Sequence, residues 1–230
     1  MWFMNSNQFI PIRFFSLVLA ILVALGMSPS RAEELKPGIG AGNVSLLDRY
    51  SPDQKKKLLA GEAIFESSKS QNPDDGKEVL GRTAILINQP VAECFKIFCD
   101  FDRQYLYYPR MTISRVLKSE GNQVQIYKEL DFALATVKYT HILTIDPDDH
   151  RVDFVTDPTG KNSVKFTRGY FRFERVDEGR SLFTYEMKKM DTGFRIPGFV
   201  KTFLSKQDLP EIAVNLKKRI ESGGMWEKKQ

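Results

Sequence analysis

Three basic or titratable side chains interrupt otherwise apolar strand faces, and their types and spacing suit ligand chemistry. Arg115, Lys128 and His141 each stand among apolar residues when alternate positions of three successive β-rich segments are read together. An unpaired buried charge is costly, so each of these groups would need a partner. If they face an internal space, they would hold the polar or anionic end of an otherwise apolar ligand.

A second interpretation of the same residues stays open at the level of sequence. Arg115 and Lys128 would then lie at strand ends or bulges and extend their charged ends to solvent. His141 would be an ordinary core histidine, hydrogen-bonded to a tyrosine or a carboxylate.

Catalysis by His141 is an alternative function, because a tyrosine or carboxylate beside it would allow acid–base chemistry. Candidate acids occur at Glu129, Asp131 and Glu186, but the sequence does not place them beside the histidine. The chain contains no glycine-rich phosphate loop, GxSxG motif or HExxH motif. We therefore assign no catalytic residue.

Metal and disulfide chemistry are not expected. His141 and His150 are the only histidines, and no CxxC or HxxxH motif occurs. Cys94 and Cys99 are five positions apart, which on one helix turns them about 140° from each other and disfavours a disulfide. We interpret both cysteines as small buried hydrophobic residues and expect no metal and no cofactor. A strained or intermolecular disulfide is the alternative for an exported protein.

Residues 1–32 have the pattern of a cleaved secretory signal. Arg13 precedes the apolar run Phe14–Met27, which is too short to span the ~30 Å hydrocarbon core of a membrane comfortably. The small residues Ser30 and Ala32 predict cleavage after Ala32 and a periplasmic or secreted location. An uncleaved N-terminal anchor is the alternative.

The charge balance argues against a nucleic-acid partner. The net charge is +5 for the whole chain, and it falls by two without residues 1–32 because they contain two arginines and no acids. Such a small surplus is compatible with transient contact with an anionic membrane surface. The roughly 200 residues that follow Ala32 suit one domain with a full core, and we expect a monomer.

Residues 33–78 are expected to form a leader with one short helix. Ser51-Pro52-Asp53 is a typical helix start, with a capping serine, a proline and an acid. It predicts a helix at Pro52–Leu59 that ends before Gly61. Ala63–Ser67 is expected as a short edge strand.

Residues 79–222 carry the pattern of one domain. We expect a strand at Val79–Asn88, a short helix from Pro90 and a second short helix within 99–111. Six more strands are expected at Met111–Lys118, Gln123–Phe132, Thr136–Ile145, Arg151–Thr156, Val164–Arg175 and Ser181–Met190. A long amphipathic helix should follow at 199–221, with a kink or break at Pro210, and residues 223–230 should form a polar tail.

This order of elements predicts the fold class. Strands joined by successive hairpins form an antiparallel, strongly twisted sheet. A helix of about twenty residues spans ~30 Å and can lie along the concave face of that sheet. We therefore predict an α+β helix-grip fold, in which a curved antiparallel β-sheet wraps around a long C-terminal α-helix, with two short helices after the first strand.

The same motifs resemble the START-like, birch-pollen-allergen-like (SRPBCC) helix-grip superfamily, and within it bacterial polyketide-cyclase and coenzyme-Q-binding type proteins. The resemblance covers roughly Val79–Glu221 and rests on Pro90–Phe95, Asp100–Met111, Gly169–Phe173 and Ile196–Phe199. It implies a cavity and a lipid, sterol, quinone, polyketide or plant metabolite as ligand. It implies no universal catalytic residues, and the corresponding enzymatic alternative is a cyclase or aromatase that uses His141.

The stretch CDFDRQYLYYPRM, residues 99–111, is expected at one mouth of the gripped space. Its aromatic rings would cover that mouth while the tyrosine hydroxyl groups reach water. The sequence does not decide between a movable gate and a fixed plug.

These patterns favour an exported binding or transfer protein for a hydrophobic, lipid-like small molecule held between sheet and helix. A ligand-free module at the membrane surface is a further alternative. The predicted ligand-binding residues are Phe101, Tyr105, Tyr108, Met111, Ile113, Arg115, Lys128, Tyr139, His141, Leu143, Phe171, Phe173, Phe183, Tyr185, Met187, Ile212 and Leu216.

Overall fold

The described chain consists of short helices, a run of strands and a longer C-terminal helix. The computed structural model describes residues 45–69, 79–132, 135–191 and 208–229. The helices are η1 (Leu46–Arg49), α1 (Pro52–Leu59), α2 (Val91–Phe98), η3 (Phe101–Leu106) and α4 (Asp208–Glu221), of which η1 and η3 are 3-10 helices. The strands are β1 (Ile64–Lys69), β2 (Val79–Ile87), β3 (Met111–Glu120), β4 (Gln123–Phe132), β5 (Ala135–Asp146), β6 (Arg151–Thr156), β7 (Phe166–Arg175) and β8 (Ser181–Asp191). Three features expected from the sequence lie outside the described residues: the secretory signal, the motif at 196–199 and the first part of the long helix, 199–207.

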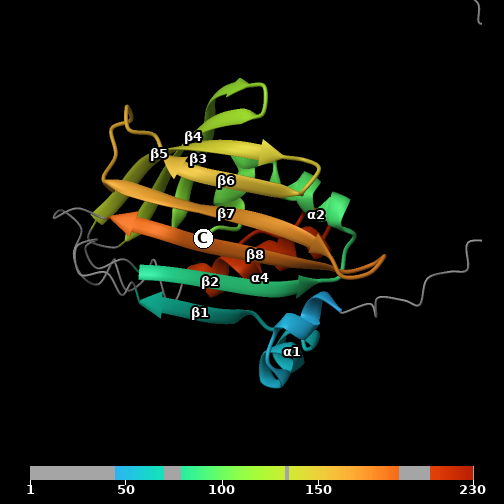
Figure 1. Cartoon of the computed structure of the whole chain (residues 1–230). Coiled ribbons are helices and arrows are strands. Elements are labelled where there is room, and N and C mark those ends of the chain that lie inside the picture. The colour runs from blue at the N-terminus through green and yellow to red at the C-terminus, as the bar shows by residue number, and fades with distance from the viewer. Residues whose placement is uncertain (1–44, 70–78, 133–134, 192–207, 230) are drawn as a thin grey trace, which may run out of the picture. The chain divides into compact units, whose positions relative to one another are not determined.

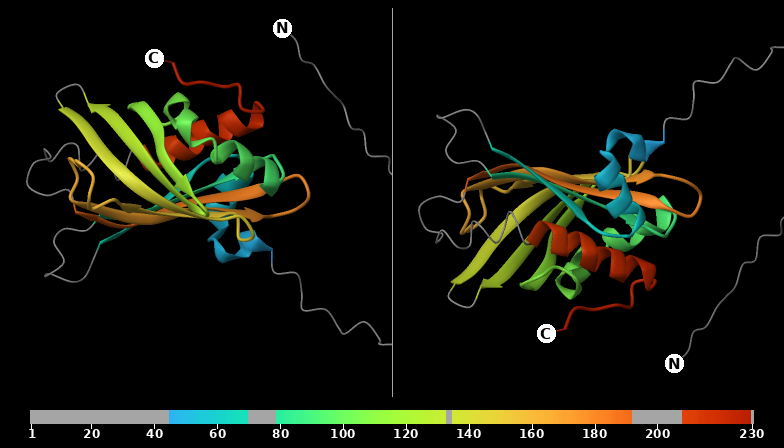
Figure 2. Two further views of the ribbon diagram at one scale, coloured as in Figure 1. Left: turned by 90° about the horizontal axis from the view of Figure 1, so that it is seen from above. Right: turned by 90° about the horizontal axis from the view of Figure 1, so that it is seen from below.

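The strands form one antiparallel sheet in the order β1-β2-β8-β7-β6-β5-β4-β3 (Figure 1). Strands that follow each other from β3 to β8 are neighbours in the sheet, as are β1 and β2, whereas β2 pairs with β8, which lies far from it in the sequence. The sheet bends so that β3, β4 and β5 rise on the side where α4 lies (Figure 2). This is the predicted helix-grip arrangement of a curved sheet and a C-terminal helix.

Helices cover both faces of the sheet. α4 lies on the inner, concave side, and α1 lies on the outer side (Figure 2). α4 buries an apolar stripe, Ile212, Leu216 and Ile220, in the main core, as its four-residue spacing predicts. On the outer side, Leu47 and Leu58 pack with Ala84 and Leu182 of the sheet.

Several element boundaries confirm the prediction from sequence. α1 begins at Pro52 and ends at Leu59, and the side chain of Ser51 accepts a hydrogen bond from the backbone of Gln54 in a capping box. Gly61 follows with a φ of 77°, the left-handed conformation that favours glycine. Strands β4 and β6 also have the predicted bounds.

Two observations bear on the expected boundaries of the domain and of the last helix. β1 pairs with β2 along its length, so residues before 79 take part in the sheet, and residues 44–230 form one compact unit. Pro210 lies in the first turn of α4 as described, where a missing backbone N–H costs nothing. The kink or break expected there stays a prediction, because residues 199–207 lie outside the described residues.

Candidate functional site

Aromatic rings from several strands line the inner face of the sheet. Phe171 and Tyr185 lie with their ring centroids 4.5 Å apart, and Phe98 of α2 lies 4.9 Å from Phe171. Phe154 packs 5.2 Å from Phe171 on the other side. Because these positions alternate along paired strands, their rings gather on one face and form a continuous apolar wall.

Lys128 is buried within this apolar interior. It is 2% exposed on β4, directly opposite Tyr139 of β5 in the strand register. Its ammonium nitrogen lies 5.4 Å from the centroid of the Tyr108 ring, and no hydrogen bond or ion pair joins it to another described residue. Burial lowers the pKa of Lys128 to about 7, because a charged amine is disfavoured away from water.

His141 lies next to Lys128 and has one free ring nitrogen. Its Nε2 is 2.8 Å from the Thr167 hydroxyl, which is in turn 2.8 Å from the Thr156 hydroxyl. Its Nδ1 is buried and has no hydrogen-bond partner, while the ring stacks on Phe154 at 5.0 Å. Burial first, and the nearby charge of Lys128 second, hold the pKa of His141 well below its usual value, so the ring is neutral.

A second group of polar side chains connects the start of α4 to the sheet. Asp208 is buried, and its Oδ1 lies 3.4 Å from Nε of Arg110, while its Oδ2 has no partner. Arg110 has a φ of 59°, a left-handed conformation that residues other than glycine rarely adopt. Burial raises the pKa of Asp208 to about 6, although Arg110 opposes this shift.

Three tyrosines complete the polar lining. The hydroxyl of Tyr108 is buried without a partner. Burial raises the pKa of Tyr108, Tyr139 and Tyr185 well above 10, so all three stay protonated at neutral pH. The nearby charge of Asp208 contributes to the shifts of Tyr139 and Tyr185. The described part of the interior therefore combines one unpaired amine with several neutral hydroxyl groups.

The structure brings most of the predicted site residues together on the inner face. Those that are buried are Phe101, Tyr108, Met111, Lys128, His141, Leu143, Phe171, Phe173, Phe183, Tyr185, Met187, Ile212 and Leu216, and Tyr139 is half-buried against them. Their burial fits the predicted facing, whereas their role in binding stays a prediction.

Three predicted residues lie elsewhere. Ile113 is 39% exposed, Arg115 is exposed, and Tyr105 is 38% exposed. The pairing of β3 with β4 shifts register between Met111 and Ile113, and such a bulge moves the side chains that directly follow it to the opposite face. Ser114 consequently points inward, and the guanidinium of Arg115 lies 5.9 Å from the Tyr127 ring outside.

The acids that could have served His141 do not reach it. Glu129 accepts a hydrogen bond from Tyr127 and lies 3.3 Å from Nζ of Lys138, and Glu186 accepts one from Tyr170 at 2.8 Å. Among the described residues, the side-chain partner of His141 is a threonine hydroxyl and not a carboxylate.

Sequence reasoning missed four polar residues of the interior: Arg110, Thr156, Thr167 and Asp208. The two threonines occupy buried alternate positions on β6 and β7, and that alternation was a usable signal. Asp208 looked like one of many charged residues in a long helix, and only the packing of the α4 start identifies it.

The stretch at residues 99–111 is held in place by the chain that follows α4. Tyr107 and Tyr108 are buried, in contrast to Tyr105. Nζ of Lys228 donates to the backbone carbonyls of Tyr108 and Met111, each at 2.6 Å, and its backbone N–H donates to the carbonyl of Leu106 at 2.9 Å. The segment at 223–229, expected as a polar tail, therefore clamps this stretch.

Other site types find no support in the described part of the chain. It contains no cluster of His, Cys, Asp and Glu side chains that could hold a metal ion. Cys94 and Cys99 are both free, and burial raises the pKa of each thiol, that of Cys94 to about 11. None of the described helices has the length and apolar character needed to cross a membrane.

The fold is similar to that of solved START-superfamily structures. A START superfamily protein from Mycobacterium smegmatis matches with a TM-score of 0.52 and 12% identity, over 62% of this chain and 97% of that one. A STAR-related lipid transfer protein from Xanthomonas axonopodis gives 0.52 and 15%, over 67% and 98%. Human StAR-related lipid transfer protein 5 gives 0.51 and 9%, over 77% and 98%.

No protein-family model matches the sequence, and no curated protein sequence matches it. The structural likenesses establish that the chain has the START-like helix-grip fold. At such low identity they define the fold, and the chemistry of the site has to be argued from its own residues.

Proposed function

We propose that this protein is an exported binding or transfer protein for a hydrophobic, lipid-like small molecule held between the inner face of the sheet and α4. Export rests on the signal-like pattern of residues 1–32. Transfer and sequestration need no catalytic group, which suits a site where His141 contacts threonine rather than a carboxylate. Apolar burial of the ligand would drive binding, at ~25 cal/mol per Å².

One observation carries this proposal: unpaired polar groups sit deep inside an aromatic wall. Lys128, Nδ1 of His141 and the hydroxyl of Tyr108 are buried without a hydrogen-bond partner among the described residues. Buried polar groups in folded proteins are nearly always satisfied. A bound molecule with an apolar body and one polar end would satisfy these groups and cover the aromatic rings.

Native mass spectrometry of the purified protein, followed by organic extraction, tests the proposal. We expect a co-purifying apolar molecule, or uptake of a hydrophobic fluorescent probe after delipidation. Met187→Trp should reduce uptake because residue 187 is buried on the inner face, and Lys188→Trp is the matched control because residue 188 is exposed. Absence of both a bound molecule and probe uptake, in protein of native circular dichroism, would contradict the proposal.

A further inference from the structure

The chemistry around Lys128 restricts the class of ligand. Its ammonium group lies 5.4 Å from the ring of Tyr108, its register partner is Tyr139, and its titratable neighbour is His141. All three neighbours are neutral at pH 7, because burial keeps the tyrosines protonated and the histidine deprotonated. No described anion compensates the lysine.

The other buried charged groups that the structure describes have polar partners. Arg110 and Asp208 form an ion pair at 3.4 Å, so together they contribute no net charge. On the outer side of the same strands, Glu129 pairs with Lys138 and is bonded by Tyr127. The other buried cation, Arg219, lies 3.8 Å from Glu227, so Lys128 is the buried cation of the described chain that has no carboxylate partner.

We propose that Lys128 binds the carboxylate of a single-chain amphiphilic acid, with the hydroxyl of Tyr108 and Nδ1 of His141 as its neighbouring polar contacts. This inference rests on the proposed function and adds the ligand's head group to it. The acid brings the carboxylate partner that Lys128 lacks, and charge-assisted hydrogen bonds are about twice as strong as neutral ones.

Charge count and shape favour a carboxylic acid over a phosphate monoester. A phosphate monoester carries about −1.5 to −2 charges at pH 7, which exceeds the one unpaired lysine. A carboxylate carries one charge and accepts hydrogen bonds through two oxygens. The aromatic wall formed by Phe154, Phe171 and Tyr185 suits the apolar chain of the ligand.

Binding of two matched probes to the delipidated full chain tests the assignment. Hexadecanoic acid and hexadecanol have the same chain and differ in the head group, and each can be delivered from cyclodextrin and titrated by calorimetry. We expect the acid to bind the unmodified protein at least ~10-fold more tightly than the alcohol, as charged hydrogen bonds typically provide. Equal affinity for the two probes, or tighter binding of hexadecyl phosphate, would overturn the assignment.

Two substitutions locate the head group. Lys128→Met keeps an unbranched side chain of similar length and removes its charge, so it should weaken acid binding at least ~10-fold and leave alcohol binding within ~3-fold. Lys138→Met is the matched control, since Lys138 is exposed and pairs with Glu129 outside, and it should change neither affinity. Unchanged acid binding by Lys128→Met would overturn the role of Lys128.

Failure of the assignment and failure of the proposed function give different results. If the alcohol and the acid bind equally well, the interior binds apolar chains and only the head-group assignment fails. If neither probe binds the folded protein, the proposed function fails together with the assignment.

Discussion

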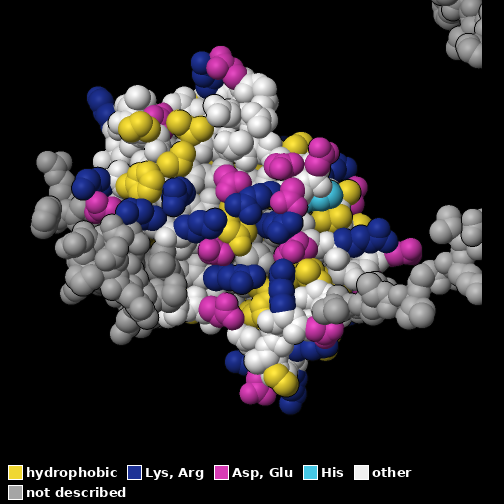
Figure 3. Space-filling view, in the orientation of Figure 1, with side chains coloured by type: hydrophobic (Ala, Val, Ile, Leu, Met, Phe, Trp, Pro, Cys, Tyr) yellow, Lys and Arg dark blue, Asp and Glu magenta, His cyan; other side chains and the backbone are white. Residues whose placement is uncertain are grey.

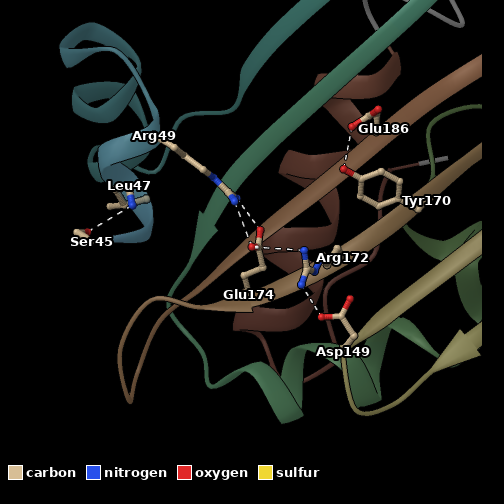
Figure 4. A network of polar contacts seen from close by, with 8 residues as sticks. All are labelled: Ser45, Leu47, Arg49, Asp149, Tyr170, Arg172, Glu174 and Glu186. Atoms are coloured by element: carbon tan, nitrogen blue, oxygen red, sulfur yellow. Dashed lines mark hydrogen bonds and ion pairs between the residues drawn. The ribbon is translucent and has the colours of Figure 1, made fainter. Parts of the chain in front are cut away.

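The two faces of the sheet treat charged groups in opposite ways. On the outer face, Lys, Arg, Asp and Glu side chains intermingle over the strands (Figure 3). Arg49 pairs with Glu174 at 2.5 Å, and Arg172 pairs with Asp149 at 2.5 Å (Figure 4). On the inner face, Lys128 has no such partner among the described residues.

This difference indicates that the inner face is the candidate binding surface. Paired charges at a half-exposed surface are ordinary, and each contributes little to stability. An unpaired buried amine lowers the stability of the folded protein, and an apolar side chain such as methionine would avoid that cost. The presence of a lysine at this position therefore indicates a functional role. The inner face thus leaves buried polar groups without partners, and a ligand could supply those partners.

The largest expected effect comes from Lys128→Met. Burial lowers the pKa of Lys128 from 10.5 to about 7, so below pH 7 folding carries the full cost of the buried amine. This cost declines as pH rises from 7 to 10.5, because the folded protein has released the proton that the unfolded chain still binds, and it disappears once the unfolded chain releases that proton too. Lys128→Met should therefore stabilise the ligand-free protein by about 4 kcal/mol at pH 6, and the gain should vanish near pH 10.5.

Urea unfolding of both proteins at pH 6 and pH 10 measures this gain. The control Lys138→Met, at an exposed lysine that pairs with Glu129, should change the free energy of unfolding by less than about 1 kcal/mol. A loss of stability in Lys128→Met at pH 6 would mean that the amine is paired. The inner face would then not differ from the outer face in how its charges are paired.

A smaller effect is expected at Asp208. Burial raises its pKa from 3.8 to about 6, so its charged form costs stability above pH 6, and the cost disappears below pH 4. Asp208→Asn should stabilise the protein by about 2 kcal/mol at pH 7.5 and by almost nothing at pH 4. Thermal denaturation at both pH values measures this difference.

The half-exposed Asp153, which pairs with Arg151 at 2.7 Å, offers the control. Asp153→Asn should lower stability slightly at pH 7.5, because it removes a favourable surface pair. If Asp208→Asn and Asp153→Asn change stability equally at both pH values, the burial of Asp208 has no energetic consequence. The energetic difference between the inner and outer faces would then be smaller than proposed.

The clamp at Lys228 should have a local effect. Lys228→Met removes two hydrogen bonds to the carbonyls of Tyr108 and Met111, each worth about 1 kcal/mol. Hydrogen exchange should accelerate across residues 106–111 while β7 stays protected. Faster ligand uptake in this variant would identify the stretch as a movable gate, and unchanged uptake would identify it as a fixed plug.

The smallest effect is expected on the outer face. Arg172→Met breaks the pair with Asp149, yet both side chains are substantially exposed, so the free energy of unfolding should fall by less than about 1 kcal/mol. High salt should reduce the difference further because it screens exposed charges. A loss of several kcal/mol in the free energy of unfolding that persists at high salt would contradict this expectation. It would show that the outer ion pairs contribute as much to stability as buried groups do.

The fold was largely predictable from the sequence, and the site only in part. The bounds of α1 followed from Ser51 and Gly61, and the facing of β4 followed from its regular alternation. The facing of β3 was not predictable, since the bulge after Met111 arises from its pairing with β4 rather than from local composition. Asp208 was missed because its burial depends on long-range packing, which a local sequence pattern does not reveal.

The pKa of Lys128 tests the central claim most directly. NMR titration of the lysine side chains in delipidated protein, with Lys128→Met to assign the signal, should give a pKa of about 7 for Lys128. Hexadecanoic acid should raise this pKa by at least ~1 unit, since a nearby carboxylate favours the charged amine. A pKa near 10.5 in the ligand-free protein, unchanged by the acid, would contradict the account.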